Sequence, residues 1–153
     1  MERVSARIVP ATNGFAELTY TGQMQGGMRD GFGGASWATG SFKSYDGQWR
    51  EGKIHGQGIM EYSTGDVYEG QYVDGRKHGQ GFYRWTSGNS HEGQWMDDKQ
   101  HGHGLYKSSG GDTHEGQWVE EKRQGRFVYS KAGGTRYERI YENNVITSET
   151  IIP

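Results

Sequence analysis

The sequence predicts an all-β protein, a single-layer twisted antiparallel β solenoid built from tandem 23-residue β-hairpin repeats. Three observations lead to this prediction. The chain repeats itself every 23 residues, its aromatic residues alternate with a period of two inside each repeat, and glycine occupies 27 of its 153 positions. A period of two places alternate side chains on one face of a strand and does not fit a helix.

The composition shows how such a chain can fold without a conventional core. Leu, Ile, Val and Phe together number 21 of 153 residues, fewer than an ordinary core requires. Against disorder stand a net charge of only −2, an aromatic content of 13% and just two prolines. Aromatic rings bury on the order of 150–250 Å² each, so they can replace the missing aliphatic residues. The balanced charge also argues against a nucleic-acid binder, which needs a basic face.

The repeat has a constant register. Five segments begin 23 residues apart, at Tyr45, Tyr68, His91, His114 and Tyr137, and we number repeat positions from these residues. Glycine fills positions 3, 12 and 21 in four consecutive repeats and position 14 in three of them. An earlier repeat begins at residue 20 and carries a two-residue insertion. The predicted organisation is an N-terminal segment or cap at 1–19, an array at 20–145 and a C-terminal tail at 146–153. Within the array the repeats lie at 20–44, 45–67, 68–90, 91–113 and 114–136, followed by a partial repeat at 137–145.

Each repeat is expected to form one hairpin. In the first strand Tyr45, Gly47 and Trp49 share a face because they are two residues apart. The pair at positions 7 and 8, such as Glu51 and Gly52, suits the positive φ of a two-residue hairpin turn. A second strand with the pattern Gly-x-Gly-x-aromatic follows, and a Ser/Thr/Gly turn leads to the next repeat.

Glycine between aromatic residues on one strand face allows a ring to lie directly on the backbone. We therefore expect two aromatic columns, at positions 1 and 5, each stacking along the array. One layer does not fully cover its own apolar face, and an open groove of Tyr and Trp has the composition of a binding hot spot. We expect a partner segment to lie along this groove. Its predicted floor consists of Tyr45, Trp49, Tyr68, Tyr72, Trp85, Trp95 and Trp118.

Candidate chemistry elsewhere is weak. His55, His78 and His101 recur at one repeat position, so neighbouring members sit two strands, about 10 Å, apart. A metal ion needs its ligand atoms within about 2 Å, so this column cannot share one ion. The serines lie at turns, and none sits in a G-x-S-x-G elbow. We expect no catalytic residue, no metal site and no cofactor.

The opposite face of the strands carries acidic residues at position 2. It is expected to be a solvated face, with a docking stripe for a basic partner as the alternative. The basic column at position 9 is neutralised by neighbouring acids, which argues against attraction to an anionic membrane. The position-2 acids are Asp46, Glu69, Glu92, Glu115 and Glu138.

The tandem pattern Y-x-G-x-W-x-x-G-x-x-x-G-x-G resembles the MORN (membrane occupation and recognition nexus) repeat, from about Tyr20 to Val145. The His-Gly-Gln-Gly and His-Gly-His-Gly sequences at 55–58, 78–81 and 101–104 are similar to those of stand-alone repeat proteins of cilia and flagella, such as radial-spoke-head components. The resemblance implies an elongated antiparallel β solenoid, sometimes dimeric, used for scaffolding or partner docking without catalysis by the repeats.

We therefore expect a non-enzymatic scaffold that binds other proteins, located in the cytoplasm at the cytoskeleton. A ciliary or flagellar axoneme component, such as a radial-spoke-type subunit, is the specific expectation. The absence of cysteine fits a reducing cytosol. The alternative is a peripheral membrane adaptor that contacts phospholipid. End-to-end assembly of a homo-oligomer is compatible with the scaffold.

Overall fold

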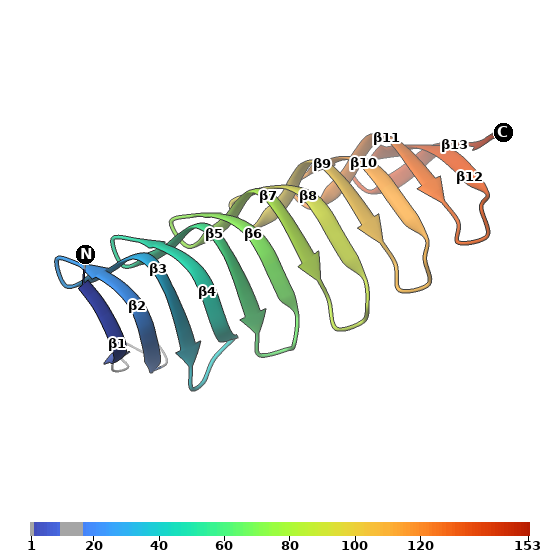
Figure 1. Cartoon of the computed structure of the whole chain (residues 1–153). Helices are drawn as coiled ribbons and strands as arrows, with labels where there is room; N and C mark the ends of the chain where they lie inside the picture. Colours follow the sequence, from blue (N-terminus) through green and yellow to red (C-terminus); the bar gives the residue numbers. More distant parts are fainter. Residues whose placement is uncertain (1, 10–16) are drawn as a thin grey trace. The chain divides into compact units, whose positions relative to one another are not determined.

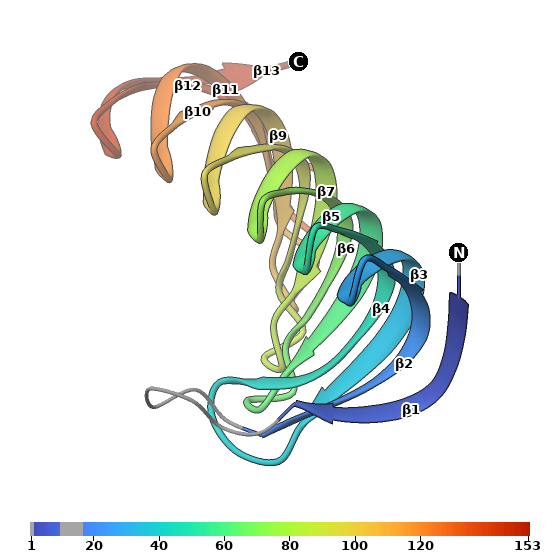
Figure 2. The ribbon, with the colours of Figure 1, turned by 90° about the vertical axis from the view of Figure 1, so that its left-hand side faces the viewer.

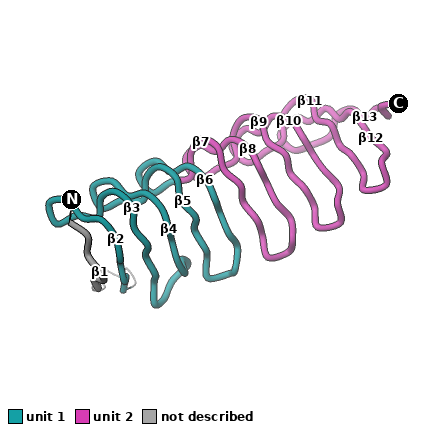
Figure 3. Tube along the Cα trace, viewed as in Figure 1, with its two compact units in different colours: residues 1–76 teal, residues 77–153 magenta. Residues whose placement is uncertain are grey.

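The computed structural model describes the backbone of residues 2–9 and 17–153, and the side chains from residue 17 onward. The chain forms two compact units, unit 1 at residues 1–76 and unit 2 at residues 77–153 (Figure 3). Within the described ranges all regular secondary structure is β-strand. This confirms the predicted all-β class.

Neighbouring strands along the chain are also neighbours in the sheet within each unit, and every such pair is antiparallel (Figure 1). Unit 1 contains β1 (Glu2–Val9), β2 (Leu18–Gln25), β3 (Met28–Trp37), β4 (Phe42–Arg50), β5 (Lys53–Tyr62) and β6 (Val67–Val73). Unit 2 contains β7 (Arg76–Arg84), β8 (Ser90–Met96), β9 (Lys99–Lys107), β10 (Thr113–Val119), β11 (Lys122–Ser130), β12 (Arg136–Glu142) and β13 (Val145–Ile152). The predicted single-layer antiparallel hairpin repeat is confirmed.

The two ends of the chain are also built from strands. Most of the predicted C-terminal tail, 146–153, lies in β13, which pairs with β12. The partial repeat at 137–145 is therefore extended into a complete hairpin. In the predicted N-terminal cap, β1 pairs with β2. The other residues of that cap up to residue 16 lie outside the described ranges.

The hairpin turns have the backbone that the sequence predicts. Glu51 and Gly52 have φ values of 48° and 80°, and Asp74 and Gly75 have values of 47° and 82°. Positive φ at both central residues is typical of a turn whose twist matches the flanking strands. Each turn also joins its repeat to the preceding one, because the amide of position 8 donates to the carbonyl of position 10 one repeat earlier. These bonds run from Gly52 to Arg29, Gly75 to Ile54, Asp98 to Lys77, Glu121 to Gln100 and Asn144 to Arg123.

Replacing Glu121 by glycine is expected to stabilise unit 2. Glu121 has a φ of 69°, a left-handed conformation that costs a residue with a side chain about 1 kcal/mol and glycine almost nothing. The hydrogen bond that its backbone amide donates to the Gln100 carbonyl, at 2.9 Å, does not involve the side chain. Urea denaturation of Glu121→Gly should show a free energy of unfolding about 0.5–1 kcal/mol higher. The reverse change at Gly75, Gly75→Ala, should lower it, and a Glu121→Gly protein no more stable than the wild type would contradict the prediction.

Candidate functional site

A bulge at position 12 shapes the aromatic face. Gly56 and Gly102 occupy this position with φ values of 71° and 91°, and the strand register shifts beside them, between Gly47 and Trp49 and between Gly93 and Trp95. The side-chain oxygen of the position-4 glutamine accepts the backbone N–H released by the bulge. Gln48 Oε1 accepts from the Gln57 amide at 2.7 Å, and Gln94 Oε1 accepts from the His103 amide at 2.9 Å. A bulge bends its strand, and Figure 2 shows β2 to β4 bending along their length.

The glycines of positions 3 and 14 form a bare strip of backbone. Gly33, Gly47, Gly58 and Gly70 are successive cross-strand partners in unit 1. The Tyr45 ring lies on this strip, and a Cβ atom added at Gly58 would collide with it. The predicted role of these glycines is confirmed. The phenol is fixed as well, because Tyr45 Oη donates to the Gln48 carbonyl at 2.9 Å, and the position-1 tyrosines Tyr20 and Tyr68 make the same bond at 2.7 and 3.0 Å.

The rings of positions 1 and 5 alternate in one zigzag of edge-to-face contacts. The expectation that each column stacks on itself is wrong. Members of one column lie two strands, about 10 Å, apart, which is too far for ring contact, so a ring of the other column fills each gap. In unit 1 the centroid distances are 5.4 Å for Tyr20–Trp49, 5.3 Å for Trp49–Tyr45, 5.7 Å for Tyr45–Tyr72 and 5.1 Å for Tyr72–Tyr68. In unit 2 they are 5.5 Å for Trp95–His91, 5.0 Å for His91–Trp118, 5.5 Å for Trp118–Phe127 and 5.2 Å for Phe127–Tyr141.

The fifth repeat, 114–136, builds its core differently. Phe127 stands at position 14, where the four preceding repeats have glycine. Its ring is fully buried against Gly116 and takes the place that the position-1 ring holds elsewhere. His114, at position 1, instead stacks on Tyr129 with a centroid distance of 4.7 Å. In the sequence, the replacement of the position-14 glycine indicated that this repeat is irregular. It did not indicate which ring would lie on the strip.

Six of the seven predicted groove residues are buried. Their exposed fractions range from 0% for Tyr68 to 8% for Trp118, whereas Trp85 is half-buried. The six are members of the zigzag described above and form the core of their units. Partner binding by these seven residues stays a prediction. Their burial leaves these six side chains little surface for such a contact.

A second row of rings in unit 2 is more exposed and was missed by the sequence analysis, apart from Trp85. We name Tyr83, Trp85, Tyr106 and His114 the outer aromatic row; all four are half-buried. Successive centroid distances are 4.7, 6.0 and 5.9 Å. Three of these rings stand at positions 16 and 18 of the repeat, where aromatic residues recur in the sequence. This recurrence was the available signal.

Cations at position 10 cover the rings of the next repeat, and the sequence analysis did not identify them. Arg29 Cζ lies 4.7 Å from the centre of the Trp49 ring, Lys77 Nζ lies 4.8 Å from that of Trp95, and Arg123 Cζ lies 4.5 Å from that of Tyr141. Burial lowers the pKa of Lys77. Cations over ring faces gain favourable electrostatic energy. Three of the position-5 rings, those of Trp49, Trp95 and Tyr141, are therefore covered on one face by a charged residue.

Histidines of the predicted column accept hydrogen bonds from the backbone of the hairpin turn in the next repeat. His55 Nδ1 accepts the Asp74 amide at 3.3 Å, and His101 Nδ1 accepts the Glu120 amide at 3.4 Å. No group of three His, Cys, Asp or Glu side chains suited to a metal ion occurs among the described residues.

On the opposite face of the strands, the position-2 acid Glu115 pairs with His103 at 3.3 Å, and Glu138 pairs with Arg126 at 2.6 Å. Within the ranges that the structure describes, no helix is long and apolar enough to cross a membrane.

His91 makes the core of unit 2 sensitive to pH. It is fully buried at position 1, and neither ring nitrogen has a hydrogen-bond partner among the described residues. Burial lowers the pKa of His91 to about 4. The pKa of His114 is also lowered to about 4, chiefly by burial, and further by Arg123 and Arg139. In the unfolded state both histidines have an ordinary pKa near 6.5. Between pH 6.5 and pH 4 the unfolded state therefore binds more protons than the folded state does. The free energy of unfolding of unit 2 should therefore fall as the pH drops from about 6.5 to 4.

Replacing His91 by tyrosine is expected to stabilise the protein and to weaken this pH dependence. Tyr68, at the same repeat position in unit 1, donates its hydroxyl to the Gln71 carbonyl at 3.0 Å. A tyrosine at position 91 can make the corresponding bond to the Gln94 carbonyl, worth about 1 kcal/mol. Urea denaturation at pH 7 and pH 5 should show a gain at both values and a larger gain at pH 5. An equal pH dependence in the two proteins would contradict this account.

The comparison with known families agrees with the geometry of the repeats. The model of the MORN repeat matches residues 20–42, 45–67, 68–90 and 91–113, more than half of the chain. The gap at residues 43–44 falls where the sequence predicts a two-residue insertion. No curated protein sequence matches the chain. The constant hairpin register, the glycine strips beneath the rings and the family match together show that the chain belongs to the MORN-repeat family.

Proposed function

We propose that this chain is a non-enzymatic scaffold whose aromatic face holds a segment of a partner protein. MORN repeats are protein- or membrane-interaction modules, and proteins that contain them are typically non-enzymatic scaffolds. The observation that carries the proposal is the outer aromatic row of unit 2, where four neighbouring rings remain partly exposed. Partly exposed Tyr and Trp side chains are enriched in the energetic centres of protein interfaces.

The two sets of rings have different roles in this proposal. The buried zigzag gives each strand a fixed position, and the outer aromatic row presents the surface that a partner touches. Trp85 belongs to both the predicted groove and the outer aromatic row, so it is the residue on which we expect binding to depend most. Its ring contacts Tyr83 at 4.7 Å and Tyr106 at 6.0 Å, and it is therefore held in place before a partner arrives.

We propose further that the partners are cytoskeletal and that the protein acts in the cytoplasm, as a component of a ciliary or flagellar axoneme such as a radial-spoke-type subunit. The support is the similarity of the His-Gly-Gln-Gly repeats to those of stand-alone axonemal proteins. Self-association between copies of the chain is compatible with this role. Fluorescent tagging in a ciliated cell, with an axonemal marker as reference, tests the location. A tag that stays away from the axoneme would contradict it.

Affinity purification of the tagged chain from its native source tests partner binding. We expect co-purifying proteins to be enriched by the wild type and reduced about tenfold or more by Trp85→Ala, the loss typical of an interface hot spot. Phe82→Ala is the matched control, because Phe82 is exposed on β7, which ends just before Trp85, and lies on the face opposite to its neighbour Tyr83. Circular dichroism should show both variants folded. Equal recovery with Trp85→Ala and the wild type would contradict the assignment.

The membrane alternative makes a different prediction. A peripheral adaptor should sediment with vesicles containing phosphatidylserine, and added salt should release it because such attraction is screened. The scaffold proposal predicts no sedimentation at physiological ionic strength. Salt-sensitive sedimentation would favour the membrane alternative.

A further inference from the structure

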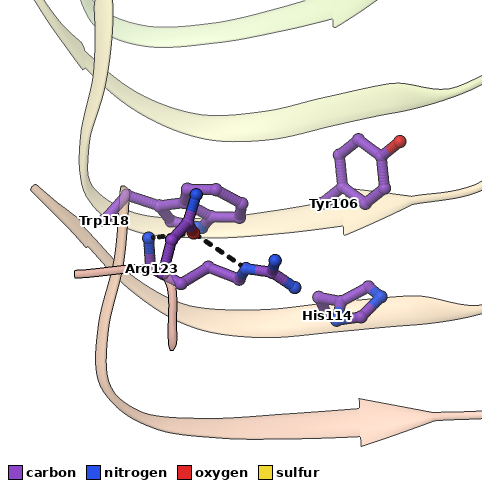
Figure 4. A pocket seen from close by; sticks show the side chains of 5 residues that line it. Tyr106, His114, Trp118 and Arg123 are labelled. Atoms are coloured by element: carbon purple, nitrogen blue, oxygen red, sulfur yellow. Dashed lines mark hydrogen bonds between the residues drawn. The ribbon is translucent and has the colours of Figure 1, made fainter. Parts of the chain in front are cut away.

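Unit 2 contains a pocket on its aromatic face. It has a volume of about 220 Å³ and is lined by Tyr106, His114, Trp118, Arg123 and Asn144 (Figure 4). These side chains come from β9, β10, β11 and the turn before β13. Small-molecule and cofactor sites are usually about 300–1,000 Å³. This smaller pocket has room for one large side chain.

The pocket coincides with a departure from the repeat. In the fifth repeat Phe127 lies on the glycine strip, and His114, which lines the pocket, lies beside Tyr129 instead. The pocket therefore lies in the repeat whose ring arrangement differs from that of the others.

Arg123 supplies a fixed cation to this pocket. Its Nε donates to Asn144 Oδ1 at 3.1 Å, and one terminal nitrogen donates to Tyr141 Oη at 3.1 Å. The other terminal nitrogen donates to no residue that the structure describes, and the guanidinium points toward His114 (Figure 4). Contact with the Tyr141 ring at 4.5 Å holds the group further. A guanidinium that is already positioned loses little conformational entropy when it binds.

The charges around the pocket leave Arg123 without a carboxylate partner among the described residues. Arg139 pairs with Glu149 at 2.6 Å. The Asp112 carboxylate accepts the Tyr129 hydroxyl at 2.7 Å and the Ala132 amide at 3.0 Å. His114, half-buried between Arg123 and Arg139, has an Nδ1 atom with no hydrogen-bond partner in the described part of the chain. The pocket therefore combines three rings with one cation whose second terminal nitrogen is still able to donate.

We propose that this pocket binds the side-chain carboxylate of a glutamate or aspartate in the partner segment, with the neighbouring apolar part of that segment lying against Tyr106 and Trp118. This inference rests on the proposed function and names the chemistry of the partner. Guanidinium and carboxylate groups match in shape and form short, charge-assisted hydrogen bonds. Desolvation by the surrounding rings strengthens such a pair relative to one in water.

Two synthetic peptides test the proposal on the full chain. The peptide acetyl-Gly-Phe-Glu-Gly-amide carries the carboxylate, and acetyl-Gly-Phe-Gln-Gly-amide is its neutral match. Titration at pH 7, followed by NMR of the Trp118 indole N–H and the Arg123 Nε–H, should give a dissociation constant on the order of 1 mM for the Glu peptide and about tenfold weaker binding for the Gln peptide. Equal shifts from the two peptides, or no shift at these two residues, would overturn the proposal.

Variants separate the pocket from the general charge of unit 2. Arg123→Gln should remove the preference for the Glu peptide, whereas Arg126→Gln, which removes the same charge from the opposite face, should keep it. The comparison of two peptides on the wild-type protein does not depend on either variant folding. If Arg126→Gln lost the preference as Arg123→Gln did, the proposal would be overturned.

Inorganic phosphate distinguishes the remaining ligand class. A stronger shift at Arg123 with phosphate than with the Glu peptide would assign the pocket to phosphorylated ligands and overturn the carboxylate proposal. The peptide titration tests the carboxylate pocket and needs no native partner. The affinity purification with Trp85→Ala tests the proposed function and does not depend on a carboxylate in the partner. Failure of one therefore leaves the other result interpretable.

Discussion

Replacing Gly58 by alanine is expected to destabilise unit 1 by about 3 kcal/mol or more. The added Cβ would collide with the Tyr45 ring, which lies directly on the glycine strip. The ring cannot move away without losing its edge-to-face contacts with Trp49 and Tyr72 and its hydroxyl bond to the Gln48 carbonyl. Gly58 does not have a left-handed backbone, so the expected effect comes from the side chain alone.

Gly34→Ala is the matched control. Gly34 lies in β3, and a Cβ added there would come no closer than 3.8 Å to another residue, the Tyr45 carbonyl oxygen. Alanine in a strand is preferred over glycine by about 0.5–1 kcal/mol, so this variant should be as stable as the wild type or slightly more so. Urea denaturation of the three proteins provides the comparison. Equal losses at the two positions would show that the ring contact is not the cause.

Replacing Phe127 by glycine restores the repeat pattern in the sequence but is expected to cost about 4 kcal/mol. Phe127 is fully buried and joins Trp118 to Tyr141, at centroid distances of 5.5 and 5.2 Å. Its removal leaves a cavity, because His114 lies outside this core beside Tyr129. Denaturation of Phe127→Gly should show the loss in unit 2.

The double variant His114→Tyr with Phe127→Gly should recover about 1–3 kcal/mol of that loss. A tyrosine at position 114 can occupy the freed glycine strip, as Tyr45 does in unit 1, and donate its hydroxyl to the Gln117 carbonyl. His114→Tyr alone should have little effect, since Phe127 still fills the space. Additive effects of the two changes would contradict the exchange of rings described for the fifth repeat.

The sequence is sufficient to predict the hairpins. Strand spacing follows from the period of two at Tyr45, Gly47 and Trp49, and the turns follow from the pairs at positions 7 and 8, which have positive φ values in the structure. These features are local, so a short stretch of chain determines them. The role of Gly58 beneath the Tyr45 ring also follows, because a glycine between two aromatic residues on one face has few other uses.

The arrangement of the rings is not local and could not be predicted in the same way. Position 12 shifts the strand register by a bulge, and this shift changes which residues of neighbouring strands lie opposite one another. The cation–ring contact of Arg29 with Trp49 joins residues in different repeats, so it depends on how neighbouring strands are placed. Phe127 and His114 exchange places because only one ring fits on the strip, and packing decides between them.

For the candidate site, the sequence predicts which strand face carries the rings but overestimates the exposure of those rings. Alternation places Trp49 and Trp95 on the aromatic face, and both lie there. It cannot tell that the edge-to-face zigzag buries them almost completely. Arg123 was missed because its importance comes from a pocket whose lining residues belong to three different repeats and meet only in the folded structure.

The stacked hairpin turns have a consequence for how such a chain can change in length. Each turn binds the repeat before it through one amide, as Gly75 binds Ile54, and the Tyr45 ring touches the position-5 rings of its own repeat and the next, Trp49 and Tyr72. Duplication of a whole 23-residue segment, such as 45–67, would reproduce every one of these contacts. An insertion of any other size inside a strand would break the register. The protein can therefore become longer or shorter by whole 23-residue repeats. Each added repeat supplies new ring positions, and its exposed side chains can change independently of the others.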